Sequence, residues 1–274
     1  MFDRIAASYD RANRFLSFGL DLHWRRSLAN HVPKSTPLNV LDIATGTGDQ
    51  IAALIKKKTP ILSAVGIDFS ENMLHIAKDK FARSSTEELL PERRRFFRRF
   101  WRRCTYRRSP IYHIACLDPP LKEWNCGKRC IHFQKANAEA LPFDDQAFDL
   151  CTFSFGIRNV QHPLSALSEM HRVTKQNGRC LILELSLPRN RLRTFYLLYL
   201  RYIVPLIGGW FSKDRSPYRH LNQSIENFVS REKFMSWMQQ TGWKDVASFN
   251  LFLGIVTLYR GDKKDIHEKG VSVE

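Results

Sequence analysis

The stretch VLDIATGTGD at residues 40–49 decides the fold predicted for this chain. It begins as an apolar run rich in branched residues and ends in glycines, which is typical of a buried parallel strand that turns tightly into a helix. The segment 48–58 has the apolar periodicity of that helix, and the run at 62–68 predicts a second strand. Strand, helix and strand in this order indicate a right-handed unit of a parallel sheet.

The same alternation continues along the chain. Ser70 is placed to cap a helix, and Gly178 is placed to end a later helix over residues 163–175. Further apolar runs predict the remaining strands, the last two as an antiparallel hairpin, at residues 131–136, 147–155, 179–186, 246–250 and 254–261. We therefore expect one α/β domain over residues 1–262.

Four segments depart from this alternation. Residues 1–35 predict two short helices that form an N-terminal lid, and residues 188–229 predict an aromatic, helical segment on the substrate side. A basic insertion is expected at 83–130 and a charged, flexible tail at 263–274. A chain of 274 residues, 43% of them hydrophobic, is long enough to bury one substantial core with these additions.

The composition argues against several classes of protein. No uninterrupted apolar run reaches 18 residues, and the N-terminus lacks a basic stretch followed by an apolar one, so we expect neither a spanning helix nor a secretory signal. The six cysteines are scattered, which favours a reducing cytoplasm over a disulfide scaffold. We therefore expect a cytoplasmic protein, with peripheral contact at the inner face of a membrane as an alternative.

Half of the formal net charge of +16 lies in the expected insertion. The run ERRRFFRRFWRRCTYRR at 92–108 predicts a basic helix with aromatic residues along one side. It is a solvated or disordered extension, an anchor for anionic lipid, or a nucleic-acid surface, and we favour nucleic acid least. The insertion also contains a set of possible zinc ligands: Cys104, His113, Cys116, Cys126, Cys130 and His132. Their spacing matches no paired zinc-binding pattern, so we expect no metal.

The glycine loop predicts a ligand at the carboxyl end of the first strand. Gly46 and Gly48 let a ligand approach the backbone, and Asp68 follows where a carboxylate can accept both ribose hydroxyls of an adenosine. The third glycine of the dinucleotide pattern is missing, while Asp49 would repel pyrophosphate but suit the cationic amino-acid end of S-adenosylmethionine. With Asp42 as a second acid behind the loop, the pattern favours a methyl donor over NAD; an ordinary turn is the alternative.

Several longer pieces of the sequence are more specific than the loop. They are FDRIAASYDRANRFLSFGLDLHWRR at the N-terminus, GIDFSENML, QKANAEALPF, FSFGIRNV and SPYRHLNQSI. Through them the chain resembles the ubiquinone/menaquinone biosynthesis C-methyltransferases over most of 1–82 and 131–262. The resemblance implies a class I methyltransferase fold, which is a Rossmann-like, doubly wound sheet of seven strands.

The resemblance also implies a cofactor and its contacts. S-adenosylmethionine is the expected methyl donor, and a ring carbon of a polyprenylated quinol is the expected acceptor. Asn137 and Ala138 follow a strand where amides can read an adenine edge, although Asn137 also suits a plain turn. The matching positions implied to contact the donor are Thr47, Asp68, Asn137, Ala138 and Ser154, beside Asp42, Gly46 and Gly48 of the loop.

Three residues are candidates for the chemistry at the ring. Arg158 could stabilise a phenolate, or instead form a salt bridge with a nearby acid, and Asn159 could hold the other ring oxygen. His220 could accept the proton that leaves the ring carbon, or be simply a solvated loop residue. The apolar segment 195–211 either receives the prenyl tail at a membrane surface or forms a buried core helix.

The acceptor stays open between demethylmenaquinol, which we favour, and a benzoquinol of ubiquinone biosynthesis. A methyltransferase of RNA or of another small molecule is a runner-up with the same donor. From a different class, the chain could be a non-catalytic donor-binding component of a membrane complex, but the intact acids and glycines of the loop argue against a dead site. The sequence predicts no oligomeric state.

Overall fold

The computed structural model describes residues 10–33, 37–84, 113–114, 130–189, 191–212 and 216–264. The basic run at 92–108 and residues 265–274 of the expected tail lie outside these described residues. The expectations for the basic insertion therefore stay predictions.

The described residues form a single mixed sheet with the strand order β3-β4-β2-β1-β5-β6-β8-β7. Neighbouring strands from β3 to β6 pair in parallel, whereas β8 is antiparallel to both β6 and β7. The seven expected strands are β1 (Leu38–Ile43), β2 (Ile61–Asp68), β4 (Cys130–Lys135), β5 (Phe148–Ser154), β6 (Thr174–Leu185), β7 (Lys244–Leu251) and β8 (Val256–Asp262). The two-residue β3 (His113–Ile114) adds an edge strand from within the expected insertion.

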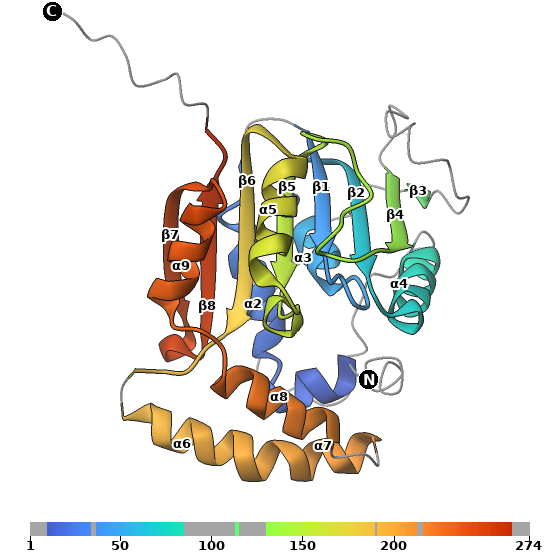
Figure 1. Ribbon diagram of the computed structural model, residues 1–274. Helices are drawn as coiled ribbons and strands as arrows, with labels where there is room; N and C mark the ends of the chain where they lie inside the picture. The colour runs from blue at the N-terminus through green and yellow to red at the C-terminus, as the bar shows by residue number, and fades with distance from the viewer. Residues whose placement is uncertain are drawn as a thin grey trace, which may run out of the picture.

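Helices cover both faces of this sheet, as expected for a doubly wound fold (Figure 1). Successive residues of a strand point to opposite faces, so Val40 belongs to one apolar cluster and Leu41 to the other. The Val40 side is packed by α2 (Leu20–Ala29), α3 (Asp49–Lys56) and α4 (Glu71–Ser84). The Leu41 side is packed by α5 (Pro163–Val173) and α9 (Arg231–Gln240).

A further helical layer lies beyond the carboxyl ends of the parallel strands, whose arrows point toward it in Figure 1. It contains helical residues 10–16 and the predicted 188–229 segment, which has its own apolar cluster. The segment consists of α6 (Leu192–Leu198), a π-helical turn (Tyr199–Ile203), α7 (Val204–Ser212) and α8 (Ser216–Glu226). No helix in the described ranges is both long and apolar enough to cross a membrane.

Two details of the sequence prediction are wrong. Gly178 does not end a helix: α5 stops at Val173, and Thr174 is already extended and begins β6. A Cβ at Gly178 would lie 2.6 Å from Thr174 Cγ2, so the glycine serves close packing within the strand. Lys263 is not part of a flexible tail, because it is buried and its Nζ donates to the carbonyls of His171 and Thr174, at 2.8 Å each.

Candidate active site

A cavity of about 830 Å³ lies between the carboxyl edge of the sheet and the helical layer. One end is lined by the glycine loop and by residues that follow β2, β4 and β5. The other end is lined by apolar and aromatic side chains of α6, α7 and α8. A volume of this size is typical of cofactor and substrate sites.

The two glycines of the loop serve different purposes. Both have left-handed backbone conformations, with φ of +56° at Gly46 and +80° at Gly48. A Cβ at Gly46, on the cavity wall, would have no atom within 4 Å, so a ligand can approach this backbone closely. A Cβ at Gly48 would lie 2.7 Å from Phe81 Cε2, so Gly48 is required by packing rather than by the ligand.

Asp42 lies behind the loop and outside the residues that line the cavity. Its carboxylate accepts hydrogen bonds from Thr45 Oγ1 at 2.7 Å and from Thr152 Oγ1 at 2.6 Å. Complete burial raises the pKa of Asp42 to about 6 in spite of these two donors. Asp42 therefore links the loop to β5 through these two hydrogen bonds. The geometry does not support a direct contact between Asp42 and the methyl donor.

Asp68 lies on the cavity wall at the end of β2, as the sequence predicts. Its Oδ2 accepts from the backbone N–H of Gly46 at 2.8 Å, and its Oδ1 accepts from that of Ser70 at 2.9 Å. A carboxylate has about four lone-pair positions, so both bonds are compatible with acceptance from ribose hydroxyls. Ser70 caps α4 as predicted, because its Oγ accepts from Met73 N at 3.3 Å.

Asn137, Ala138 and Ser154 also line the cavity. Asn137 Oδ1 accepts from Glu139 N at 3.0 Å, which is the turn arrangement that the sequence left open. Ser154, which is buried, donates through Oγ to Gln50 Oε1 at 3.1 Å. The structure thus brings these predicted donor contacts to one end of the cavity.

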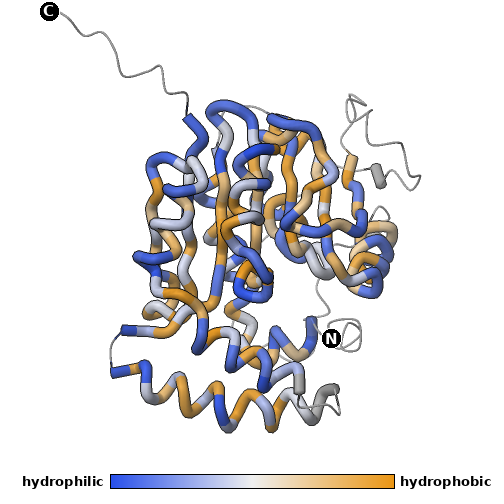
Figure 2. The backbone as a smooth tube through the Cα atoms, in the orientation of Figure 1, coloured by the Kyte–Doolittle hydropathy of each residue, from blue (hydrophilic) through white to orange (hydrophobic). Residues whose placement is uncertain are grey.

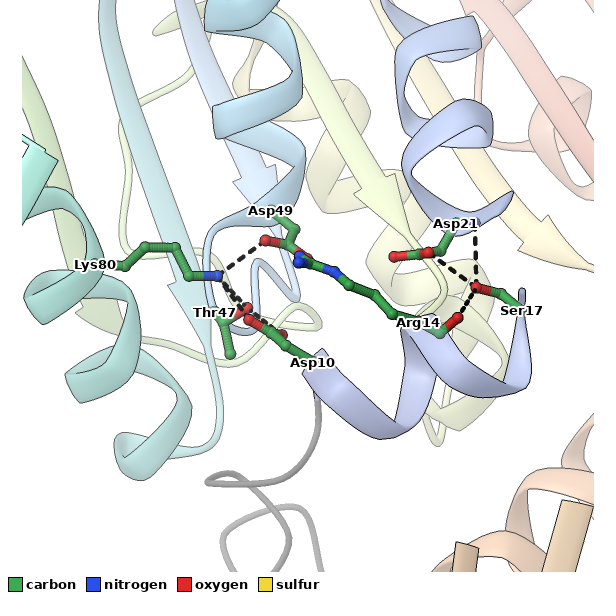
Figure 3. A network of polar contacts seen from close by, with 7 residues as sticks. All are labelled: Asp10, Arg14, Ser17, Asp21, Thr47, Asp49 and Lys80. Atoms are coloured by element: carbon green, nitrogen blue, oxygen red, sulfur yellow. Dashed lines mark hydrogen bonds and ion pairs between the residues drawn. The ribbon is translucent and has the colours of Figure 1, made fainter. Parts of the chain in front are cut away.

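Asp49 lines the cavity but is already paired with two cations (Figure 3). Its carboxylate lies 2.9 Å from Arg14 Nη2 and 2.9 Å from Lys80 Nζ. Although burial opposes ionisation, the charges of Lys80, Arg25 and Arg14 hold the pKa of Asp49 well below its usual range. These partners were not predicted from the sequence, although Arg14 lies on the predicted lid and Lys80 on the helix that Ser70 caps.

The three candidates for ring chemistry all line the cavity. Arg158 lies in the short 3₁₀ turn after β5, and its Nη1 forms an ion pair with Glu184 and donates to Phe155 O at 2.8 Å. Both readings of Arg158 therefore have structural support: it is paired with an acid and it faces the cavity. His220 lies on α8 rather than in a loop, and both His220 and Asn159 are exposed.

Other cavity residues escaped the sequence analysis. Asp21 on α2 is buried at the wall, with Oδ1 accepting from Ser17 Oγ at 2.9 Å. Helical spacing places Trp24 on the same side of α2, and its ring packs 6.1 Å from that of Phe155. Three members of the disfavoured zinc set lie outside the described residues: Cys104, Cys116 and Cys126. Within the described residues, no group of three or more metal-ligating side chains could hold a metal ion.

Comparison with known proteins identifies the family. The model of the ubiE/COQ5 methyltransferase family matches residues 1–90 and 121–263. The chain belongs to this family. The unmatched residues 91–120 fall inside the stretch expected to be an insertion. The resemblance found in the sequence is thereby confirmed.

Individual relatives agree with this membership. The ubiquinone/menaquinone biosynthesis C-methyltransferase UbiE of Geotalea uraniireducens is 37% identical, over 96% of this chain and 94% of the relative. The demethylmenaquinone methyltransferase of Thermotoga maritima is 34% identical, over 96% and 94%. A solved structure of a SAM-dependent methyltransferase from Thermotoga maritima superposes with a TM-score of 0.56 at 18% identity, over 96% of this chain and 98% of that one.

The family and its relatives establish an enzyme that uses S-adenosylmethionine for C-methylation in quinone biosynthesis. The site fits this donor on its own geometry. The open space over Gly46 and the carboxylate of Asp68 lie at the same end of the cavity, where the parallel strands end. The non-catalytic alternative has no support from these comparisons.

Proposed function

We propose that the enzyme methylates a ring carbon of demethylmenaquinol and so forms menaquinol. The equivalent methylation of a benzoquinol in ubiquinone biosynthesis is the alternative. The observation that carries a prenylated acceptor is the lining of the cavity, which includes both the donor loop and apolar side chains of the α6–α8 segment. Relatives named for demethylmenaquinone, such as the Thermotoga maritima enzyme, support the naphthoquinol.

The apolar end of the cavity suits a prenyl chain. Its wall contains side chains of Leu192, Tyr196, Leu200 and Val204, all from the α6–α7 segment. Tyr196, Leu200 and Val204 are buried, so this wall is apolar and packed against the protein core. A ring bound near Arg158 would therefore have an apolar path for its tail.

Arg158 is the residue proposed to favour the reactive form of the ring. A ring carbon is a strong nucleophile only when the adjacent oxygen is ionised, and a fixed guanidinium stabilises that phenolate. When bound, S-adenosylmethionine supplies a methyl group on a sulfonium, which is an excellent leaving group. Holding the ring in line with that group within roughly 3–3.5 Å then provides much of the rate acceleration.

Asn159 and His220 are proposed to complete the acceptor site. Asn159 follows Arg158 in the same turn, where its amide can hold the second ring oxygen. His220 projects from α8 at the cavity wall, where an imidazole can take the proton that leaves the methylated carbon. We propose Gly46, Thr47, Asp68, Asn137, Ala138 and Ser154 as the donor contacts.

We further propose that the α6–α7 segment rests on an anionic membrane surface. Large apolar residues at spacings of three and four are exposed along it: Phe195 at 69%, Leu198 at 49%, Tyr202 at 64% and Leu206 at 58%. Figure 2 places α6 and α7, in which hydrophobic and hydrophilic residues alternate along the chain, at the outer side of the helical layer. Arg191 and Arg193 are exposed at the start of the segment, where they can meet lipid headgroups.

The experiment that tests the acceptor uses purified enzyme and methyl-labelled S-adenosylmethionine. Demethylmenaquinol and the corresponding benzoquinol, each reduced and each carrying the same prenyl chain, are compared at equal concentration. We expect faster labelling of the naphthoquinol. Faster labelling of the benzoquinol would support the ubiquinone alternative, and labelling of neither would refute both.

A further inference from the structure

Lys80 joins three separate parts of the donor end of the cavity (Figure 3). From α4 its Nζ donates to Asp10 Oδ2 at 2.8 Å, to Thr47 Oγ1 at 2.9 Å and to Asp49 Oδ1 at 2.9 Å. These acceptors come from the N-terminal helix, the glycine loop and the start of α3. An ammonium has three N–H donors, so these three contacts match its full donor capacity.

Two more contacts tie the N-terminal helix to the same place. Thr47 Oγ1 donates to Asp10 Oδ1 at 2.7 Å, and Arg14 Nη2 donates to Asp49 Oδ2 at 2.9 Å. Asp10 and Arg14 are one helical turn apart, so the helix meets the glycine loop and the start of α3 through adjacent turns. The loop and the helix are therefore held together by charge.

Lys80 contacts residues of the cavity wall without lining the cavity itself. Asp10, Thr47 and Asp49 line the cavity, whereas Lys80 is not among its lining residues. The side chains of Lys80, Asp10 and Asp49 are 26%, 25% and 12% exposed, so solvent screens their interactions less than on an open surface. Without the ammonium, the carboxylates of Asp10 and Asp49 would lie close together with less compensating charge.

We propose that Lys80 is a positioning residue for the methyl donor. It holds the N-terminal helix against the glycine loop, so that Asp10 and Thr47 form a pre-arranged wall of the donor site. Pre-arrangement raises affinity because the ordering cost is met before the ligand binds. The proposal concerns donor binding alone and does not depend on which quinol is methylated.

The test compares Lys80→Met with Lys78→Met, an exposed lysine on the same helix. Binding of S-adenosylmethionine is measured by calorimetry without quinol. We expect Lys80→Met to raise the donor Kd by about tenfold, as loss of charged hydrogen bonds implies, and Lys78→Met to leave it unchanged. In assays, the donor KM should rise while kcat at saturating donor and the KM of the quinol stay within about twofold of the wild type.

Asp10→Asn and the double variant supply the second measurement. If Asp10 and Lys80 act as one unit, Asp10→Asn also weakens the binding of S-adenosylmethionine. The double variant Asp10→Asn/Lys80→Met then binds S-adenosylmethionine no more weakly than the single variant with the higher Kd. Asp10→Asn carries the test alone if Lys80→Met does not fold. A donor Kd equal to the wild type in a folded Lys80→Met or Asp10→Asn protein overturns the proposal, as does an equal loss in Lys78→Met.

Discussion

Arg158 and Glu184 form an ion pair at the carboxyl edge of the sheet, where their side chains are 6% and 1% exposed. Glu184 is the penultimate residue of β6, which pairs with β5, and Arg158 lies in the turn that follows β5. Glu184 also accepts from the backbone N–H of Leu185 at 2.8 Å. Arg158 Nε donates to Ser224 Oγ on α8 at 3.3 Å. Among the described residues none accepts from Arg158 Nη2, so this nitrogen of a cavity-lining residue is available to a ring oxygen.

Replacing Arg158 should therefore separate chemistry from donor binding. Arg158→Ala removes the cation that is proposed to stabilise the phenolate, and we expect kcat to fall by about a hundredfold or more. The donor Kd, measured by calorimetry, should stay near the wild-type value, because no predicted donor contact bonds to Arg158. Near-normal turnover would refute the proposed role of Arg158.

Glu184→Gln tests how the arginine is held. The variant leaves a buried guanidinium without its counter-charge, which typically costs about 3–5 kcal/mol of stability. We expect that loss in denaturant unfolding, together with a lower kcat. Glu232→Gln is the matched control, because Glu232 pairs with Arg189 at the surface, where such pairs contribute about 0–1 kcal/mol. Equal stability losses in the two variants would contradict the buried pair's importance.

The local pattern of the sequence predicted the strands and the loop because their signals lie within ten residues. The apolar run and glycines of 40–49 determine a buried strand and its turn wherever the rest of the chain lies. Parallel strands end at one edge of the sheet, so residues at or just after these ends could be predicted to lie together. The cavity is indeed lined there by Thr47, Asp68, Asn137 and Ser154.

The partners of these residues could not be predicted in the same way. Glu184 is 26 residues from Arg158, and Lys80 is 70 residues from Asp10. Such pairings depend on how helices pack on the sheet, which no local periodicity encodes. The alternative that His220 is a solvated loop residue is wrong, because His220 lies on α8 within the segment 188–229 that the sequence predicts to be helical.

Asp42 should make stability depend on pH near neutrality. Burial raises its pKa from an ordinary 3.8 to about 6, so the folded protein binds this proton more tightly than the unfolded chain. This contribution to stability is complete below pH 3.8 and is lost as the pH rises through 6. Between pH 7 and pH 5 it amounts to about 1.4 kcal/mol.

The measurement is the unfolding free energy of the wild type and of Asp42→Asn at both pH values. Subtracting the unfolding free energy of one protein from that of the other cancels the contributions of the other titrating groups. It should shift by about 1.4 kcal/mol in favour of the wild type on going from pH 7 to pH 5. A constant difference would show that Asp42 does not titrate in this range.

Gly46→Ala and Gly48→Ala should have separable effects. A Cβ at Gly48 meets the Phe81 ring at 2.7 Å, so we expect a loss of stability of about 1–3 kcal/mol from overpacking, besides the left-handed backbone strain. At Gly46 only the backbone strain of about 1 kcal/mol applies, but the methyl group enters the cavity. Gly46→Ala should therefore weaken the binding of S-adenosylmethionine by more than its small loss of stability, measured by thermal unfolding, can account for. The opposite ranking of stability losses would contradict the packing role of Gly48.

The membrane proposal predicts that charges on the outer side of the α6–α7 segment abolish lipid binding. Tyr202 and Leu206 are exposed and lie outside the cavity lining, so the double variant Tyr202→Asp/Leu206→Asp should keep turnover of a short-chain, water-dispersed quinol. In flotation with anionic vesicles, the wild type should rise with the lipid and this variant should stay at the bottom, because aspartate resists burial among acyl chains and is repelled by anionic headgroups.

Leu164→Asp, an exposed leucine on α5, is the control and should float like the wild type. Vesicles without anionic lipid separate the two contributions to binding. If apolar contact and the charges of Arg191 and Arg193 act together, flotation of the wild type is reduced on neutral vesicles but not lost. Failure of the wild type to float on anionic vesicles, or flotation of the double variant as strong as that of Leu164→Asp, would remove this segment as the docking surface.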